Sequence, residues 1–473
     1  MKKLTELYPN YTQPDIWIKG IKINSKEIEP GDIFVCTMGV TADRHDFIEE
    51  AVKNGAAAIV VQKDAECIVP VIKVENTNKE LPLLASRFYD HPEDKLDMIG
   101  ITGTNGKTTV ATIIQNLIGN KTCGYLGTNG IICSEFNETI RNTTPDSDRL
   151  YGYFKRFVDS GCKYLSIETS SEAFYRKRLD NLKFKVGIIT NITEDHLNIH
   201  KTIENYVYCK KQLVNQVRDD GFSILNIDDS HYQEVRESAK GTILTYGKKE
   251  STLQIINAIF SFDNTVVTLK YQDKLYEFES PLLGEFNVYN LCAAFLALIA
   301  IGYDIETIVQ RVPNIIAPSG RVEFLKFGQN YNIVLDYAHT PDAFSKLFSL
   351  LDKIKKGRII TITGSAGGRE KEKRPQMGKV VLDNSDYVIF TMDDPRYEDP
   401  RDIIADLIST SDKTNYEIII DRKEAIYKAC ELAQENDIVL VAGKGTDNYM
   451  AVEDKYLPYC DLEVIKEYFE RDN

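Results

Sequence analysis

Met98-Ile-Gly-Ile-Thr-Gly-Thr-Asn-Gly-Lys-Thr-Thr-Val110 is the segment from which the fold of the middle of this chain is predicted. An apolar run ends in a glycine-containing loop, and a helix-like segment continues directly to Leu117. A strand, a glycine loop and a helix in this order bind phosphate, because the glycines let backbone N–H groups face phosphate oxygens and the helix N-terminus adds partial positive charge. The sequence therefore predicts an ATP or GTP site at Gly103, Thr104, Asn105, Gly106, Lys107, Thr108 and Thr109.

Two side chains of this loop have the chemistry that a triphosphate requires. Lys107 is placed to reach the β- and γ-phosphates, and the Thr108 hydroxyl is placed to ligate Mg²⁺. The strict phosphate-loop pattern has another glycine where Ile101 stands, so the match is partial. The alternative interpretation is an ordinary strand–turn–helix corner.

Length and composition narrow the class of protein. The 473 residues allow about three domains. A net charge of -14 argues against nucleic acid or an anionic membrane as the main partner. No apolar run approaches the roughly 20 residues of a membrane span, and the first residues lack the apolar core of a signal peptide. The nine cysteines include no C-x-x-C pair, which favours reduced thiols. We therefore expect a cytoplasmic protein without membrane insertion.

Strand and helix patterns divide the chain into three α/β units. Residues 1–95 form a small unit of short strands and helices. Residues 96–318 alternate continuous apolar runs with helical patterns, which indicates a parallel sheet covered on both faces, and residues 251–283 are typical of a small antiparallel addition. Residues 319–473 have the alternation of a Rossmann-like domain, although the turn at 364–368 lacks the G-x-G-x-x-G order of dinucleotide sites. The expected fold is α/β with three domains.

Polar residues near the ends of predicted strands are candidate site residues. Glu168 ends the run Lys163–Glu168 at the edge where parallel sheets bind ligands, so it is either a Mg²⁺ ligand or a surface acid. His196 and His200 have the spacing of two ligands on one helical face, but two polar loop histidines are an equal interpretation. On local grounds Asn287 caps the apolar helix that follows it.

The C-terminal unit adds charged candidates. Arg321 would clamp a phosphate with its planar guanidinium, and Asp336 would accept a ribose hydroxyl. The charged run 371–375 follows a glycine turn and is otherwise read as a solvated loop. The acids and arginine of Asp393-Asp-Pro-Arg396 suit an amino acid with a charged side chain, although surface ion pairs have the same pattern.

The motifs as a set resemble the Mur ligase family, and within it the tripeptide synthetases. They occur in family order over nearly the whole chain: Gly103–Thr109, Asn142–Pro145, Glu168–Ser171, Thr190–His196, Gly284–Asn290, Ser319–Arg321, Asp336–Asp342, Lys373–Pro375, Asp393–Arg396 and Gly443–Gly445. The resemblance implies a cytoplasmic, monomeric enzyme of peptidoglycan precursor synthesis. It further implies a uridine-nucleotide domain (1–95), an ATPase domain (96–318) and an amino-acid domain (319–473).

The implied reaction forms an amide at the cost of ATP. The free carboxylate of UDP-MurNAc-L-Ala-D-Glu takes the γ-phosphoryl group, and a diamino acid then displaces phosphate from the acyl phosphate. ATP and Mg²⁺ are the implied cofactors. Lys107 holds phosphate, Thr108 and Glu168 serve one Mg²⁺, and His196 serves a second Mg²⁺ with a carbamylated Lys210. Together with Arg321 these residues form the implied catalytic set.

The resemblance also implies two sets of binding residues. The nucleotide would contact the phosphate loop together with Asn287, Asn290, Arg321, Asp336 and His339. The UDP-sugar peptide and the amino acid would contact Ser25, Thr143, Thr144, Ser170, Arg178, Arg369, Asp393, Asp394, Arg396, Gly443 and Asp447.

Departures from the family pattern cluster on the substrate side. Ile23-Asn-Ser-Lys26 replaces Ser-Asp-Ser-Arg, Glu172 replaces a histidine, and Gly443-Lys-Gly-Thr-Asp447 replaces Gly-Lys-Gly-His-Glu. Asp394 stands where enzymes that add meso-diaminopimelate usually have asparagine, and its negative charge favours the ammonium of L-lysine. Arg396 offers a fork for the distal carboxylate of diaminopimelate, so we favour diaminopimelate over lysine.

Two other functions stay open at this stage. One is a paralogue that joins a different carboxylate and amine, among which a folylpolyglutamate synthetase fits the Asp336 motif less well. The other is a regulatory nucleotide-binding protein without catalysis. The presence of Glu168, His196 and Lys210 argues against the regulator, because a protein that only binds nucleotide has no need of ligands for a second metal.

Overall fold

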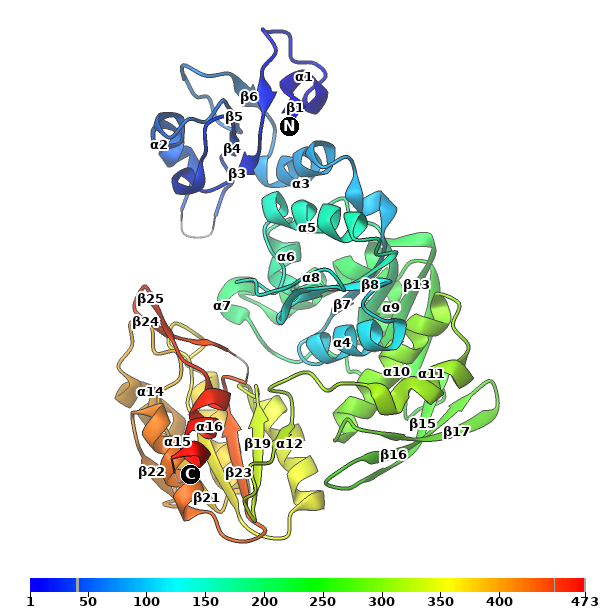
Figure 1. Cartoon of the computed structure of the whole chain (residues 1–473), viewed down its shortest axis with the longest axis vertical. Helices are drawn as coiled ribbons and strands as arrows, with labels where there is room; N and C mark the ends of the chain where they lie inside the picture. Colours follow the sequence, from blue (N-terminus) through cyan, green and yellow to red (C-terminus); the bar gives the residue numbers. More distant parts are fainter. Residues whose placement is uncertain (40–41, 446, 472–473) are drawn as a thin grey trace.

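The computed structural model describes residues 1–39, 42–445 and 447–471, and it consists of three α/β domains (Figure 1). In Figure 1 the N-terminal domain is blue, the central domain runs from cyan to green, and the C-terminal domain runs from yellow to red. The expected fold class is confirmed. The boundaries near residues 95 and 318 stay predictions. Thr446, part of the motif that ends at Asp447, lies outside the described residues.

The N-terminal domain is organised around a parallel sheet in the order β3-β4-β5-β6. Its strands are β1 (Lys2–Lys3), β2 (Trp17–Ile18), β3 (Ile21–Lys22), β4 (Ile33–Val35), β5 (Ala58–Val61) and β6 (Val71–Lys73). Its helices are α1 (Leu4–Leu7), α2 (Ile48–Lys53) and α3 (Thr77–Phe88). The Asn76 side chain caps α3 by accepting a hydrogen bond from the Lys79 N–H. The α3 face joins the central domain in one continuous apolar core.

The central domain contains a sheet in the order β10-β9-β8-β11-β7-β12-β13-β14-β15-β16-β17. Its strands are β7 (Asp97–Thr102), β8 (Cys123–Gly127), β9 (Gly130–Ile132), β10 (Asn137–Glu138), β11 (Tyr164–Glu168), β12 (Phe184–Ile189), β13 (Val217–Asn226), β14 (Thr242–Gly247), β15 (Leu253–Phe260), β16 (Thr265–Tyr271) and β17 (Lys274–Ser280). β7 lies between β11 and β12 and is parallel to both. Their carboxyl ends therefore meet at one edge of the sheet, where the phosphate loop begins.

Helices cover both faces of this sheet, as the continuous apolar runs predicted. They are α4 (Lys107–Ile118), α5 (Ser147–Asp159), α6 (Ser171–Tyr175), α7 (Leu197–His200), α8 (Ile203–Asn215), α9 (Tyr232–Ser238), α10 (Glu285–Ala300) and α11 (Ile305–Arg311). Ile99 and Ile101 of β7 belong to the core that includes α4 and α10, whereas Met98 belongs to the core on the α8 side. The antiparallel addition is also confirmed, because β15, β16 and β17 pair antiparallel beyond β14.

The C-terminal domain is a Rossmann-like sheet in the order β18-β19-β23-β20-β21-β22, in which only β18 is antiparallel to its neighbour. Its strands are β18 (Glu323–Leu325), β19 (Asn332–Asp336), β20 (Ile359–Thr363), β21 (Tyr387–Phe390), β22 (Tyr416–Ile418), β23 (Ile438–Ala442), β24 (Tyr449–Val452) and β25 (Lys455–Pro458). Its helices are α12 (Pro341–Ile354), α13 (Lys373–Asn384), α14 (Pro400–Ile408), α15 (Arg422–Leu432) and α16 (Asp461–Glu470). Among the described residues, no helix is long and apolar enough to cross a membrane.

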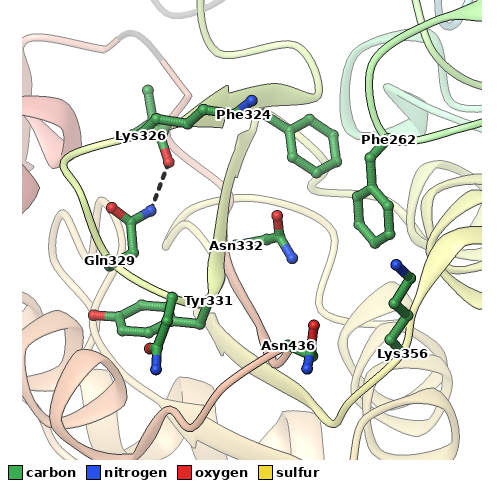
Figure 2. A pocket seen from close by; sticks show the side chains of 10 residues that line it. Phe262, Phe324, Lys326, Gln329, Tyr331, Asn332, Lys356 and Asn436 are labelled. Carbon is green, nitrogen blue, oxygen red and sulfur yellow. Dashed lines mark hydrogen bonds between the residues drawn. The ribbon is translucent and has the colours of Figure 1, made fainter.

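The tip of the β15–β16 hairpin contacts the C-terminal domain. The Phe262 ring lies edge-on to the Phe324 ring, with 6.2 Å between centroids, and Lys326 pairs with Asp263 at 3.7 Å. Phe262, Phe324 and Lys326 line a pocket of about 290 Å³, in which Figure 2 shows the Lys356 side chain pointing toward the Phe262 ring. The pocket contains none of the predicted site residues.

Candidate active site

The phosphate loop has the conformation that its glycines permit. Gly106 precedes α4 with φ +89°, a left-handed conformation in which a side chain is strained, and a Cβ there would lie 2.4 Å from Asn290 Oδ1. The Lys107 ammonium donates to the carbonyl oxygens of Gly103 at 2.9 Å and Thr104 at 3.0 Å. Burial lowers the pKa of Lys107. The lysine is thus held by weak neutral acceptors within the loop, which phosphate oxygens would replace.

Glu168 ends β11 directly beside this loop and is fully buried. Its Oε2 accepts hydrogen bonds from the hydroxyls of Thr108 at 3.0 Å and Thr128 at 3.2 Å. Its Oε1 accepts from the Tyr125 hydroxyl at 2.6 Å and the Thr128 N–H at 2.9 Å. The alternative of a surface acid is therefore wrong. A hydroxyl and a carboxylate held together are hard oxygen donors of the kind that Mg²⁺ prefers, so this donor set fits the implied metal.

His196 and Lys210 approach the same region from the loop after β12 and from α8. His196 adopts φ +56° immediately before α7, and burial lowers its pKa to about 4. Lys210 is buried, and burial followed by repulsion from Lys107 lowers its pKa well below the usual value. Within the described ranges, Lys210 has neither a hydrogen bond nor an ion pair, and its ammonium lies 4.4 Å from the Tyr206 ring centroid. A pKa of about 4 leaves the His196 imidazole neutral near neutral pH, as a metal ligand must be, and the pKa of Lys210 is lowered in the direction that favours the implied carbamate.

His200 does not join His196 as a second ligand. It lies within α7, is 1% exposed, and its Nε2 is 3.0 Å from the Ser171 hydroxyl. The interpretation of two histidines on one ligand face is therefore not supported by the geometry, because His200 points into the core beside α6. The His196 side chain is 39% exposed and lies beside Asp195, with Nε2 3.5 Å from Asp195 Oδ2.

A pocket of about 670 Å³ extends from the phosphate loop to the C-terminal domain. Asn287 and Asn290 line it from α10, where Asn290 Nδ2 donates to Asn287 Oδ1 at 3.0 Å and Asn287 Nδ2 donates to the Leu283 carbonyl at 2.7 Å. The prediction that Asn287 caps the helix is wrong, because Gly284 occupies the N-cap position. Asn287 lies inside the first turn of α10, which aims its side chain at the pocket.

Three predicted residues of the C-terminal domain line the same pocket: Arg321, Asp336 and His339. The Arg321 guanidinium lies 4.6 Å from the Tyr337 ring centroid. Asp336 is held by the N–H groups of Val322 at 2.8 Å and Ala338 at 2.7 Å, and burial raises its pKa. The pocket is therefore built by two domains, with Asn105, Gly106 and Thr109 of the central domain and Arg321 of the C-terminal domain in its lining.

The residues predicted for the acceptor form one hydrogen-bonded group beside Glu168. The Thr144 hydroxyl donates to the Glu168 carbonyl at 2.9 Å and accepts from the Ser170 N–H at 3.1 Å. Arg178 donates to the Thr144 carbonyl at 3.0 Å, and the Thr143 hydroxyl lies 3.1 Å from that of Thr128. Ser25 is not part of this group: its hydroxyl donates to Glu50 at 2.5 Å inside the N-terminal domain.

The residues predicted for the amino acid gather around Lys444, which is fully buried. Its ammonium pairs with Asp394 at 2.8 Å, Asp393 at 3.6 Å and Asp447 at 3.9 Å. Burial raises the pKa of Asp447 to about 6. Gly443 adopts φ +113°, and a Cβ there would lie 2.7 Å from Asp393 Oδ2. Lys444 was not among the predicted site residues, although it stands in the quoted motif between two glycines.

Arg396 and Arg369 complete the predicted set. Arg396 adopts φ +54°, its N–H donates to the Ala451 carbonyl at 3.0 Å, and its guanidinium forms no ion pair with any described residue. Arg369 follows the glycine turn after β20 and lies near enough to His196 and His339 to lower the pKa of both imidazoles. The structure thus brings Arg369 to the phosphate side rather than to the group around Lys444.

Two further residues line the nucleotide pocket without having been predicted for it: Asp228, which lies outside the quoted motifs, and Tyr289, which lies within Gly284–Asn290. The Tyr289 hydroxyl donates to Asp228 Oδ2 at 2.8 Å. The charged run 371–375 is solvated only at its start: Lys371 is largely exposed, whereas Lys373 begins α13 and pairs with Asp195 across the domain boundary at 2.9 Å. The signal that could have located Asp228 is its position just after the strand-like run that ends at Asn226.

Three family models match successive parts of the chain. They are described as "Mur ligase family, catalytic domain" at residues 17–89, "Mur ligase middle domain" at residues 101–298 and "Mur ligase, glutamate ligase domain" at residues 320–445. Curated relatives match almost end to end. The UDP-N-acetylmuramoyl-L-alanyl-D-glutamate–2,6-diaminopimelate ligase of Bacillus cereus is 37% identical over 460 residues, covering 95% of this chain and 94% of that protein. The ligase of the same name from Aquifex aeolicus is 37% identical over 457 residues, covering 95% and 93%.

Solved structures agree with the sequence relatives. A UDP-N-acetylmuramoyl-L-alanyl-D-glutamate–2,6-diaminopimelate ligase structure matches with a TM-score of 0.69 and 28% identity, covering 100% of this chain and 99% of that chain. The MurF ligase of Thermotoga maritima in complex with ADP matches with a TM-score of 0.68 at 20% identity, covering 96% and 97%, which supports the fold. The motifs, the domain models and the near full-length relatives agree, and the chain belongs to the Mur ligase family of enzymes.

Proposed function

We propose that this chain is the ATP-dependent ligase that joins a diamino acid to UDP-MurNAc-L-Ala-D-Glu in peptidoglycan precursor synthesis. The names of the near full-length relatives support the substrates, and the chain retains the residues that the chemistry requires. The products are ADP, phosphate and a UDP-linked tripeptide. The cytoplasmic location and the monomeric state stay predictions.

The reaction has two covalent steps. A carboxylate oxygen of the acceptor attacks the γ-phosphorus of ATP, the bond to the β,γ-bridging oxygen breaks, and ADP leaves an acyl phosphate behind. The amine nitrogen then attacks the acyl carbon, loses a proton, and phosphate leaves as the amide forms. The difficulty lies in bringing an anionic carboxylate to an anionic triphosphate, so cations must offset the repulsion.

This chain supplies those cations from two domains. Lys107 exchanges its loop carbonyls for phosphate oxygens, and Arg321 approaches the same phosphates from the C-terminal domain. Thr108 and Glu168 would hold Mg²⁺, which supplies charge neutralisation at the triphosphate. Burial lowers the pKa of the Lys210 amine, which favours its reaction with carbon dioxide to become an anionic oxygen ligand.

One connection supports this assignment more than any other. Arg178 binds the Thr144 carbonyl, Thr144 binds the Glu168 carbonyl, and the Glu168 carboxylate binds Thr108 at the start of α4, with distances of 2.9–3.0 Å. Residues that would hold the acceptor are therefore joined through Glu168 to residues that would hold the γ-phosphate. A carboxylate bound on one side would lie next to a phosphoryl group bound on the other.

The amino acid is proposed to be diaminopimelate rather than lysine. The lysine argument required a free negative charge at Asp394, but Lys444 and the Ala451 N–H both donate to Asp394 Oδ1, at 2.8 and 2.9 Å. The negative charge of Asp394 is therefore already paired within the protein. Arg396, by contrast, has no ionic partner among the described residues and remains available for a distal carboxylate.

The proposal is tested by measuring ADP, phosphate and tripeptide together. We expect ADP formation only when ATP, acceptor and amine are all present, with one amide formed per ADP. Diaminopimelate, L-lysine and L-ornithine are compared at equal concentration, and diaminopimelate is expected to react fastest. ADP formation that is indifferent to the acceptor would contradict the assignment.

A paralogous ligase for another carboxylate is the second candidate, and one contact favours it. Glu172, where the family has histidine, pairs with Arg176 at 2.7 Å and lies 4.0 Å from Arg178. Arg178 already donates to Asp146 Oδ1 at 2.6 Å, and a second carboxylate so near it would compete with an acceptor carboxylate for the guanidinium. An acceptor series that includes UDP-MurNAc-L-Ala-D-Glu and its variants lacking the uridine nucleotide decides between the two functions.

A further inference from the structure

The C-terminal domain reaches the His196 loop through one buried ion pair. Lys373 is the first residue of α13, and its ammonium pairs with Asp195 Oδ1 at 2.9 Å and Glu370 Oε2 at 2.8 Å. The Lys373 and Asp195 side chains are 18% and 12% exposed, so water screens the pair little. Asp195 belongs to the central domain and Lys373 to the C-terminal domain, so the pair exists only when the two domains are docked.

A second hydrogen bond holds the same loop on the C-terminal side of His196. The Asn198 N–H in the first turn of α7 donates to Glu370 Oε1 at 3.1 Å. Lys373 and Glu370 therefore form a paired clamp, in which the ammonium binds the residue before His196 and the carboxylate binds two residues after it. Lys371, in the same loop, is not part of the clamp, because it is largely exposed and pairs with Glu398 at 3.0 Å.

The clamped loop is the one that needs external restraint. His196 adopts φ +56°, a left-handed conformation that is unfavourable for a residue other than glycine. Asp195 Oδ1 accepts from the His196 N–H at 2.9 Å, and Asp195 Oδ2 lies 3.5 Å from His196 Nε2. The same carboxylate thus touches the backbone and the ring of His196 while it accepts the Lys373 ammonium.

We propose that Lys373 is a positioning residue through which docking of the C-terminal domain sets the orientation of the His196 imidazole. Rotation of the domain away from the loop removes Lys373 and Glu370 together and leaves His196 with only its local contacts. The inference rests on the proposed function in one respect, that His196 serves the phosphate chemistry. In this proposal the ion pair couples amino-acid binding in the C-terminal domain to the reactive arrangement of the phosphate site.

Other contacts between the two domains do not pass through this clamp. Asn105 Nδ2 donates to Asp342 Oδ2 at 3.0 Å at the phosphate loop. The Phe262 and Phe324 rings meet at the separate seam shown in Figure 2. A variant that lacks the Lys373 ammonium therefore retains contacts that dock the domain, so a change at His196 can be distinguished from simple undocking.

The test compares Lys373→Met with Lys371→Met, a lysine removed two positions away from the clamp. Two-dimensional NMR of the full chain labelled at histidine side chains reports the six imidazoles, and His196→Asn assigns the His196 signal. With ADP and Mg²⁺ present, we expect Lys373→Met to shift or broaden the His196 signal, whereas Lys371→Met leaves it in place. Lys373→Arg is expected to restore most of the native signal.

Activity gives a second, independent measurement. We expect kcat to fall about 10- to 100-fold in Lys373→Met, because a displacement of about 1 Å costs that much, while the KM for ATP changes less than about threefold. Lys371→Met should react at the native rate. If Lys373→Met does not fold, Glu370→Gln tests the same clamp and should also move the His196 signal.

The outcomes separate the two proposals. A native His196 signal in both Lys373→Met and Glu370→Gln overturns the positioning role, whatever the activity. If the native chain itself makes no tripeptide but Lys373→Met still shifts the His196 signal, the positioning role stands and the proposed function is overturned. A shifted signal together with reduced kcat supports both.

Discussion

The Thr108 hydroxyl and the Glu168 carboxylate are joined by a 3.0 Å hydrogen bond that ties the first turn of α4 to the carboxyl end of β11. Both residues are buried, and Tyr125 and Thr128 hold the remaining positions around the carboxylate. Protein hydrogen bonds therefore already hold in place the two side chains that would bind Mg²⁺ beside the phosphate loop. Preorganised charge of this kind is usually the largest single contribution to a phosphoryl-transfer rate.

Glu168→Gln should abolish most activity without unfolding the chain. The amide has the shape of the carboxylate but lacks the negative charge that attracts Mg²⁺, so we expect kcat to fall about 100- to 1000-fold. Steady-state ADP formation measures this, and Tyr125→Phe, which removes one neutral donor to the same carboxylate, should cost less than about tenfold. Equal rates for Glu168→Gln and the native chain would show that Glu168 does not hold the metal.

Gly106→Ala should prevent nucleotide binding. The new Cβ would lie 2.4 Å from Asn290 Oδ1, at a residue with φ +89°. We expect affinity for ATP to fall at least about 100-fold by isothermal titration. Gly119→Ala is the matched control at the other end of α4, because it has φ +99° but no atom within 4 Å of the new Cβ. It should bind ATP normally, and similar losses in both variants would point to helix strain rather than to the site.

Arg396→Lys should reduce the use of diaminopimelate selectively. Lysine keeps the charge but loses the fork that grips a carboxylate, so kcat/KM for diaminopimelate should fall about 10- to 100-fold while that for L-lysine stays low and unchanged. Asp394→Asn should alter the ratio of the two amines by less than about threefold, because Lys444 already neutralises Asp394. A large gain of diaminopimelate over lysine in Asp394→Asn would show that Asp394 faces the substrate.

Asp148 makes stability depend on pH. This carboxyl is buried in α5, and burial, followed by repulsion from Asp146, raises its pKa from 3.8 to about 6. Between these values the native state holds a proton that the unfolded chain has released, so stability falls as pH rises from about 4 to about 6 and stays lower above that range. We expect Asp148→Asn to remove this fall and to add about 2–3 kcal/mol to the free energy of unfolding at about pH 7.5.

Urea unfolding at several pH values measures the effect of Asp148→Asn. Asp159→Asn is the control on the same helix, because Asp159 is exposed and its pairing with Lys155 is worth less than about 1 kcal/mol. The difference between native chain and Asp148→Asn should grow from pH 4 to pH 6 and then level off. Parallel curves at all pH values would contradict the elevated pKa.

Much of the fold could be predicted because the strand patterns are strong. The apolar run before Gly103 and the run that ends at Glu168 became neighbouring parallel strands, and the alternating segments at 251–283 became antiparallel hairpins. The prediction of Asn287 as a helix cap is wrong, since Gly284 is the N-cap of a helix that begins at Glu285 and Asn287 lies inside its first turn. Helix ends depend on a few capping contacts, which local composition specifies weakly.

The candidate site was predictable where a motif lies in one continuous segment and less so where segments meet. Lys107 and Thr108 lie in such a segment, and their placement follows from the loop itself. The neutralisation of Asp394 by Lys444 joins residues 50 positions apart, and the charge of Asp394 was therefore misread as free. Ion pairs between distant segments leave no periodic trace in either segment.

Periodicity and contiguous motifs were enough to predict three α/β units, a phosphate loop at Gly103–Thr109 and the family of this chain. The contact of buried Glu168 with Thr108, the hydrogen bonds that join Arg178 through Thr144 to Glu168, and the ion pair of Lys373 with Asp195 are visible only in the folded chain. The physical reason is that burial, hydrogen-bond saturation and charge pairing depend on which distant segments share a space. Those quantities set the chemistry of a side chain as much as its identity does.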